Sequence, residues 1–313
     1  MTTLNRRNLL VSASALGLCS LGRSAWGQAS GPPVASIRQV TETIFGTTVI
    51  DPYRWMENER DRDWLPFLRG QDDYARAVLR NLPQRPRLLQ RIRRLSAETV
   101  ITSDVQREGG RTFLERRPRG AENYQLFVRE NGVDRLLVDP TLLDADGEHH
   151  ALDWWNASPD GSHVVYGLSR DGSEDSVLHV LRVADAAVLP DRIADTQNAT
   201  PQWLSDSSGF FYNQLTGEPD TPERYLDSRA RLHRLGTDPA TDPIVMQRGL
   251  VPGVEFDRIQ MPAVLTFPGE RHVVLALTDV RTESRWLVAS LDDVLAGRNQ
   301  WKPLAGFEDE ITH

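Results

Sequence analysis

The stretch that decides the fold runs from Ser158 to Val183 and reads SPDGSHVVYGLSRDGSEDSVLHVLRV. Two Asp-Gly pairs, Asp160-Gly161 and Asp171-Gly172, divide it. Asp-Gly favours tight turns between strands, because the turn positions need a backbone conformation that residues with a Cβ resist. Each pair is followed by a run rich in valine and leucine, which predicts a strand. The stretch therefore predicts an antiparallel meander of turn, strand, turn and strand.

The same order of turns and strands recurs along the chain. A turn glycine precedes the first strong strand of each copy, and these glycines are 51, 48 and 60 residues apart: Gly110, Gly161, Gly209 and Gly269. A period of roughly 45–50 residues with three or four strands per unit is typical of β-propeller blades. A β-sandwich is the competing interpretation, but it would not require the same internal order of turns in every unit.

We therefore predict a mainly β chain with about 3–4 propeller blades in residues 96–313. Propellers close with about four to eight blades, and a part-circle would leave strand edges and blade faces unburied. The sequence thus predicts an incomplete propeller, the front part of a longer protein.

Helical patterns precede the β region. An extended lead-in is expected from Gly31 to Ile50, and a helical region is expected to begin in Asp51–Glu57, with an aspartate as cap and a proline at the first helical position. From Asp63 to Leu82 apolar residues recur at helical spacing. A shorter, arginine-rich helix is predicted from Arg87 to Arg94.

The first 29 residues have the layout of an export signal. Arg6-Arg7 precede an apolar run from Leu9 to Leu21, and the paired arginines indicate the twin-arginine type. An ordinary Sec signal with incidental arginines is the alternative. The run is too short for a transmembrane helix, and Leu18 stands before Cys19 where a lipoprotein signal needs a small residue. We expect a periplasmic or secreted protein without a stable membrane anchor.

Composition excludes several classes of function. The chain has 36 Lys and Arg against 44 Asp and Glu, a net charge of −8, and no basic cluster on a predicted β face, which argues against nucleic acid as a partner. The single cysteine, Cys19, excludes an internal disulfide framework and a cysteine-based zinc site. His149-His150 lack a third ligand at a metal-like spacing, and no glycine loop that would hold phosphate is present. We expect neither metal nor cofactor.

Four segments resemble the prolyl oligopeptidase family of serine peptidases, in order and at compatible spacing. Asp51–Glu57, DPYRWME, resembles that family's Asp-Pro-Tyr-x-Trp-(Leu/Met)-Glu segment. Three further segments are similar to its propeller blades: Val138–Pro140, Tyr166–Ser173 and Leu232–Thr237. The likeness runs from about Val40 to the end. Each motif alone is weak, but four in series are specific.

The resemblance implies a two-domain peptidase that is a monomer in its full-length form. Residues 1–29 would be the signal, residues 30–95 would dock on an α/β-hydrolase domain, and residues 96–313 would form part of a seven-bladed propeller that gates access for short peptides. The hydrolase domain would follow the propeller, hold a Ser-Asp-His triad and cleave after proline. The Gly-x-Ser-x-Gly turn of such a nucleophile is absent from the sequence, so we expect no catalytic residue in this chain.

The resemblance also marks three substrate-facing candidates. Asn198 stands where the family has an aromatic residue in a propeller loop, and Asp279 and Arg281 lie in the loop after the first strong strand of the fourth unit. For Asp279 and Arg281 a charged, solvent-exposed loop is the competing interpretation.

The sequence as a whole predicts the propeller-containing portion of an exported prolyl oligopeptidase-type peptidase that is not catalytic by itself. A non-catalytic, propeller-like periplasmic binding protein is the alternative. The Asp51–Glu57 segment and the helix from Asp63 argue against it, because a free propeller has no use for them. A related dipeptidyl- or oligopeptidase of other specificity stays open.

Overall fold

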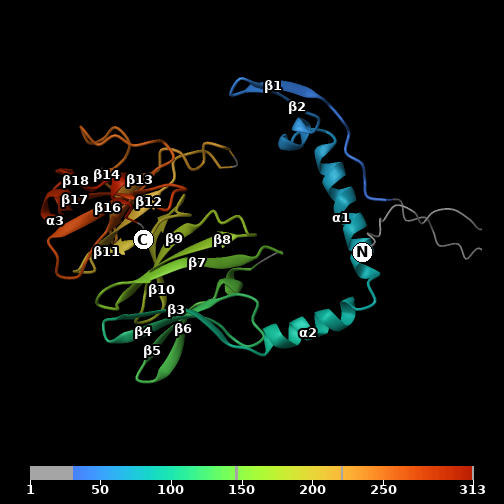
Figure 1. Ribbon diagram of the computed structural model, residues 1–313. Coiled ribbons are helices and arrows are strands. Elements are labelled where there is room, and N and C mark those ends of the chain that lie inside the picture. The colour runs from blue at the N-terminus through green and yellow to red at the C-terminus, as the bar shows by residue number, and fades with distance from the viewer. Residues whose placement is uncertain (1–30, 145–146, 220, 312–313) are drawn as a thin grey trace, which may run out of the picture. The chain divides into compact units, whose positions relative to one another are not determined.

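The computed structural model describes residues 31–144, 147–219 and 221–311, and the predicted export signal lies outside these residues. The chain divides into two compact units, Met1–Gln90 and Arg91–His313 (Figure 1). None of the helices in the described residues is long and apolar enough to cross a membrane.

The first unit contains a hairpin and a long helix. Strand β1 (Val40–Ile44) pairs with β2 (Thr47–Asp51), and the turn residues between them, Phe45 and Gly46, both have positive φ, as two-residue hairpin turns require. This hairpin lies where the sequence predicted only an extended lead-in. The helical region predicted after it is a single 3₁₀ turn, η1 (Arg54–Glu57). The predicted aspartate cap and proline start are wrong, because Asp51 belongs to β2 and the turn is preceded by Tyr53, which makes no side-chain cap. The Asp51 carboxylate instead accepts a hydrogen bond from the Tyr53 N–H at 2.8 Å.

Helix α1 (Trp64–Arg80) begins directly after Asp63, as predicted, and α2 (Arg85–Ala97) is longer than predicted. Trp55 joins α1 to the segments before it. Its ring lies edge-on to Phe67 of α1 at 5.7 Å between centroids, and its indole N–H donates to the carbonyl of Ser36 at 2.8 Å. The buried tryptophan therefore holds three consecutive parts of this unit together.

The second unit contains four four-stranded antiparallel sheets, each made of four consecutive strands. We call them blades 1 to 4. Blade 1 consists of β3 (Ile101–Glu108), β4 (Arg111–Arg117), β5 (Gln125–Glu130) and β6 (Val133–Val138), and blade 2 of β7 (His150–Ala157), β8 (His163–Arg170), β9 (Val177–Arg182) and β10 (Ala187–Ile193). Blade 3 consists of β11 (Gln202–Trp203), β12 (Gly209–Gln214), β13 (Arg229–Arg234) and β14 (Ile244–Met246). Blade 4 consists of β15 (Met261–Leu265), β16 (His272–Thr278), β17 (Arg285–Ser290) and β18 (Lys302–Ala305).

Short helical turns complete the unit. They are η2 (Pro140–Leu143), η3 (Pro239–Thr241), α3 (Leu291–Leu295) and η4 (Phe307–Asp309).

The predicted repeat is confirmed, but each blade begins one strand earlier than the sequence indicated. The marker glycines stand before or at the start of the second strand of each blade: β4, β8, β12 and β16. The first strand of blade 1, β3, was missed because no residue in it is fully buried. With this phase, the described residues form four blades, at the upper end of the predicted 3–4.

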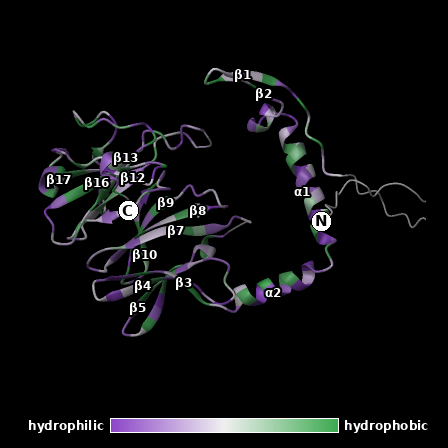
Figure 2. Cartoon of the chain, viewed as in Figure 1, coloured by the Kyte–Doolittle hydropathy of each residue, from purple (hydrophilic) through white to green (hydrophobic). Residues whose placement is uncertain are grey.

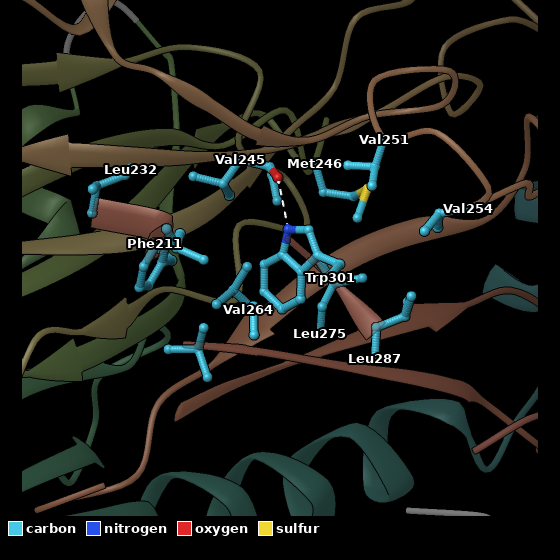
Figure 3. Packing of buried hydrophobic residues seen from close by; sticks show 14 of the residues in the cluster. Phe211, Leu232, Val245, Met246, Val251, Val254, Val264, Leu275, Leu287 and Trp301 are labelled. Carbon is cyan, nitrogen blue, oxygen red and sulfur yellow. Dashed lines mark hydrogen bonds between the residues drawn. The ribbon is translucent and has the colours of Figure 1, made fainter. Parts of the chain in front are cut away.

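Neighbouring blades pack face to face through apolar side chains. The largest cluster joins blades 3 and 4 and includes Phe211, Leu232, Val264, Leu275 and Leu287 (Figure 3). Separate clusters join blade 1 to blade 2 and blade 2 to blade 3. Hydrophobic and hydrophilic residues are interspersed along the blade strands and along α1 and α2 (Figure 2).

Tryptophan indoles supply a polar connection between neighbouring blades. The Trp301 N–H donates to the carbonyl of Val245 at 3.1 Å (Figure 3), and the Trp203 N–H donates to the carbonyl of Asn156 at 3.2 Å. The Trp155 N–H donates to the Glu115 carboxylate at 2.9 Å. A buried indole has one donor, and each of these reaches an acceptor on the preceding blade.

Substitutions in the turn between β3 and β4 can test how closely blades 1 and 2 approach each other. Gly109 and Gly110 both have positive φ, but a Cβ on Gly109 would stand 1.9 Å from the carbonyl oxygen of Asp160, whereas one on Gly110 would meet open space. We expect Gly109→Ala to lower the free energy of unfolding by about 2–4 kcal/mol through this clash. Gly110→Ala should cost about 1 kcal/mol through backbone strain alone. Urea unfolding measures both, and equal losses would contradict the close approach.

Candidate functional site

A pocket of about 300 Å³ lies where blades 3 and 4 meet. It is placed at the starts of β11 and β15 and at the ends of β12 and β16. Because consecutive strands of a blade run in opposite directions, the start of the first strand and the end of the second lie at the same end of the sheet. The pocket therefore lies toward one end of the strands in both blades.

The pocket is lined by apolar residues and by polar residues that carry no charge. The apolar residues come from β15 and its partner β16: Met261, Pro262, Ala263, Val264, Leu265 and Ala276. The polar residues are Asn198, Thr200, Gln202, Asn213, Thr278 and Trp286. Among these lining residues none carries a charge, so the pocket suits a neutral ligand with some apolar surface.

Two polar atoms of the lining residues are buried without a hydrogen-bond partner among the described residues. The Asn213 side chain is 2% exposed, and its amide N–H₂ donates to the carbonyl of Pro262 at 2.9 Å and to the Ser228 hydroxyl at 3.2 Å. Its Oδ1 has no partner, and neither has the indole N–H of Trp286. Buried polar groups normally find partners. Both atoms are themselves buried, so they are unsatisfied groups of the lining residues and not open contacts for a ligand.

The segment that presents Asn198 is held in a strained conformation. Thr200, which lines the pocket with Asn198, has φ of 41°, a value that β-branched residues rarely adopt. Ala199 between them is fixed on both sides, since its N–H donates to the Thr196 carbonyl at 3.1 Å and its carbonyl accepts from the Asn213 N–H at 2.8 Å. Strain of this kind persists only where surrounding structure imposes it, and it is frequent at ligand sites.

The structure places the three sequence-predicted candidates in two different positions. Asn198 lines the pocket, whereas Asp279 and Arg281 do not. The Arg281 Nε donates to Asp279 at 3.0 Å, and the guanidinium stacks over the Phe307 ring at 3.7 Å. Hydrogen bonds from Arg281 hold the pKa of Asp279 below its ordinary value, and those to Asp279 raise the pKa of Arg281. Of this loop, Thr278 is the residue that reaches the pocket.

Sequence reasoning missed Asn213, Met261 and Trp286 as pocket residues. Asn213 carried a usable signal, because it is an amide that directly follows the strongly apolar run Phe210–Tyr212. Such a group must be satisfied when the strand is buried. Met261 and Trp286 gave no signal, because their meeting depends on strand pairing within blade 4.

A serine, a histidine and an aspartate also meet in the turn before β8. The Ser162 hydroxyl lies 2.8 Å from His163 Nδ1 and 2.7 Å from the Asp160 carboxylate. Burial lowers the pKa of His163. In a catalytic triad the carboxylate binds the imidazole and the imidazole binds the hydroxyl. Here the carboxylate binds the hydroxyl, so the contact is that of a turn rather than of a triad.

A larger cavity of about 770 Å³ lies beside blade 2 and is lined by charges of both signs. Three of its charges are already paired: Arg170 and Glu148 bind each other at 3.0 Å, and Asp175 binds Arg224. We therefore regard the uncharged pocket as the better ligand site. Within residues 31–144, 147–219 and 221–311, no three His, Cys, Asp or Glu side chains are grouped as a metal site requires.

A family model matches most of this chain. The model described as prolyl oligopeptidase, N-terminal β-propeller domain, matches residues 32–251. A prolyl endopeptidase of Elizabethkingia meningoseptica is 23% identical over 262 residues, which cover 80% of this chain and 35% of that protein. Prolyl oligopeptidase A of Amanita bisporigera is 23% identical over 299 residues, 86% of this chain and 38% of that protein.

Solved structures show the same likeness. One from a study of two prolyl endopeptidases and the role of their inter-domain dynamics has a TM-score of 0.76 and 28% identity, and covers 87% of this chain and 39% of that one. Prolyl oligopeptidase B from Galerina marginata, bound to a 35mer substrate, shares the fold with a TM-score of 0.69 and 22% identity, over 84% of this chain and 40% of that one. The chain thus spans well under half the length of the proteins it matches.

The Asp279–Arg281 pair yields a prediction about pH. We expect Arg281→Gln to raise the pKa of Asp279, because the hydrogen bonds that lower it are lost. With Arg281 present, the contribution of Asp279 to stability is full above its ordinary pKa and is lost as pH falls through the lowered one. Carboxyl ¹³C NMR titration measures the shift. Arg271→Gln, at an exposed position, is the control and should leave the pKa of Asp279 unchanged.

Proposed function

This chain belongs to the prolyl oligopeptidase family, and from that premise we propose that it is the propeller-containing portion of an exported serine peptidase that hydrolyses short peptides after proline. The observation that carries the proposal is the match of the N-terminal propeller model to residues 32–251. The same match does not favour a non-catalytic binding protein.

In this proposal the chemistry belongs to a hydrolase domain outside the chain. A serine activated by histidine and aspartate would attack the peptide bond after proline, and water would hydrolyse the acyl-enzyme. The propeller would act by selection, since only an unfolded, short peptide could pass to such a centre. No metal or cofactor takes part, and the full-length protein would be a monomer.

The uncharged pocket supports the assignment of a peptide ligand. Its apolar lining on β15 suits a proline ring or an aliphatic side chain, and its uncharged polar lining residues suit a backbone amide. A peptide offers these groups together at short spacing. We assign Asn198 to the rim of this site.

The first unit supports the proposal of a docking partner. Helix α1 buries none of its residues within the described structure. Its apolar side chains Leu65, Leu68, Val78 and Leu79 are each more than 40% exposed. A stripe of this kind normally marks an interaction surface, and we propose that the hydrolase domain covers it.

The activity can be tested on the intact protein that carries this chain. We expect it to hydrolyse a short chromogenic peptide with proline before the leaving group, and to lose this activity on labelling with a serine-directed organophosphonate. The same peptide with glycine in place of proline is the control. Equal rates on both peptides would indicate another specificity, and no hydrolysis of either would contradict the peptidase proposal.

Filling the pocket tests its role in the same assay. We expect Ala263→Phe to lower kcat/KM for the proline peptide about tenfold or more, because misplacing a bound substrate is costly to catalysis. Val188→Phe is the matched control, since Val188 is an exposed residue of β10 outside the pocket. Unchanged kinetics in a folded Ala263→Phe protein would show that peptides do not use the pocket.

The proposed export route can be tested by substituting the paired arginines, which lie outside the described residues. Replacing Arg6 and Arg7 with lysine keeps the charge but removes the twin-arginine feature. We expect the double variant to stay in the cytoplasm, as fractionation and immunoblotting would show. Normal export would favour the Sec route.

A further inference from the structure

A buried ionic cluster joins blades 2 and 3 near the start of β12, where Phe210 pairs with His233, whereas the pocket residue Asn213 lies near the end of that strand. The imidazole of His233, on β13, is fully buried. Its Nε2 lies 2.9 Å from Oδ1 of Asp191, on β10 of blade 2. Its Nδ1 lies 3.0 Å from both carboxylate oxygens of Asp242, which follows η3 in blade 3. Both aspartates are buried as well, at 3% and 6% exposure.

The two contacts require two protons on the ring. A neutral imidazole has one N–H, and its other nitrogen is an acceptor. Since an ionised carboxylate can only accept, a neutral His233 would place a lone pair against one of the two carboxylates. We infer that His233 is an imidazolium at neutral pH and that Asp191, His233 and Asp242 form a pH-sensitive lock between blades 2 and 3.

Among the described groups that contact Asp191, His233 is the one that can carry a positive charge. Asp242 also accepts from the Tyr212 hydroxyl at 2.9 Å, and the carbonyl of Asp242 accepts from the Arg231 guanidinium at 2.6 Å. Asp191 accepts from His233 and from the N–H of Gly236 at 2.6 Å. Its second oxygen has no partner among the described residues.

The remaining neighbours do not replace this charge. His163 of β8 lies within electrostatic reach of Asp191, but burial lowers its pKa, so it is neutral at pH 7. The Phe210 ring lies 5.3 Å from the His233 ring and supplies an apolar wall. An unpaired charge in such surroundings is strongly unfavourable. Loss of the ring proton therefore removes the ionic contact between the blades.

The direction of the pH effect follows from the cluster. Burial by itself would lower the pKa of His233, but the hydrogen bonds to Asp242 and Asp191 outweigh it and the pKa is raised above its ordinary 6.5. A group with a raised pKa contributes its stability fully below the ordinary value and loses it as pH rises through the raised one. The lock is closed below the ordinary pKa of histidine and opens as pH rises through the raised pKa of His233.

Nitrogen NMR of the intact chain with ring-labelled histidine tests the protonation state directly. At pH 7 both ring nitrogens of His233 should show imidazolium shifts. Asp191→Asn keeps an acceptor but removes one charge, and should move the His233 titration to lower pH. A neutral His233 ring at pH 7, with the proton on a carboxylate, would overturn the inference.

Stability against pH is the second measurement. The urea midpoint of the wild type should exceed that of His233→Gln at pH 6.5, and the difference should shrink as pH rises through the His233 titration. His272→Gln is the matched control and should show no such trend. A difference that is constant or grows with pH would overturn the lock. If His233→Gln does not fold, the NMR titration of His233 in the wild type is compared with that in Asp191→Asn, and this comparison decides whether the inference holds.

Discussion

Every blade of this chain is stabilised by the face of the next one. A four-stranded sheet alone can cover neither of its faces, and each apolar cluster of the second unit draws its members from two neighbouring blades. Leu126 and Leu275 are fully buried only because a second sheet stands against them. The closely packed turns at Gly109 and Asp160 follow from the same constraint. Burial between blades, rather than within them, therefore sets the geometry of everything attached to the sheets.

The extent to which the sequence predicts this fold depends on which strands are buried. The strands β8 and β16 were predicted because they are apolar and preceded by turn glycines; both have buried interiors. The strand β3 has no buried residue, so its sequence carries no periodic signal, and its position is fixed by hydrogen bonding to β4. The β1–β2 hairpin was missed for the same reason, because most of its residues are exposed.

The candidate site was predictable only in part, for a different physical reason. Asn198 was predicted from the resemblance to prolyl oligopeptidases, but Asn213 and Trp286 reach one pocket through the pairing of strands whose register no local pattern reveals. For Asp279 and Arg281 the loop could be predicted from the sequence, whereas the contacts of the two side chains could not. An aspartate and an arginine two residues apart bind each other, and the nearby Phe307 ring attracts the guanidinium. Such short-range choices depend on side-chain geometry.

Polar residues between blades have a role that apolar packing cannot fill. An apolar face tolerates small rotations of one sheet on another, because the hydrophobic effect has no direction. Hydrogen bonds and ion pairs do have direction: the Trp301 indole, the buried Arg224 guanidinium and the His233 imidazole each fix a particular atom of one blade against a particular atom of another segment. Burying such groups costs desolvation energy, so they add specificity of position more than stability. The pocket lies where two blades meet, and a rotation of a few degrees between them would change its shape. Among the directional contacts, the Trp301 indole joins the two blades that form the pocket and thus helps to define its shape.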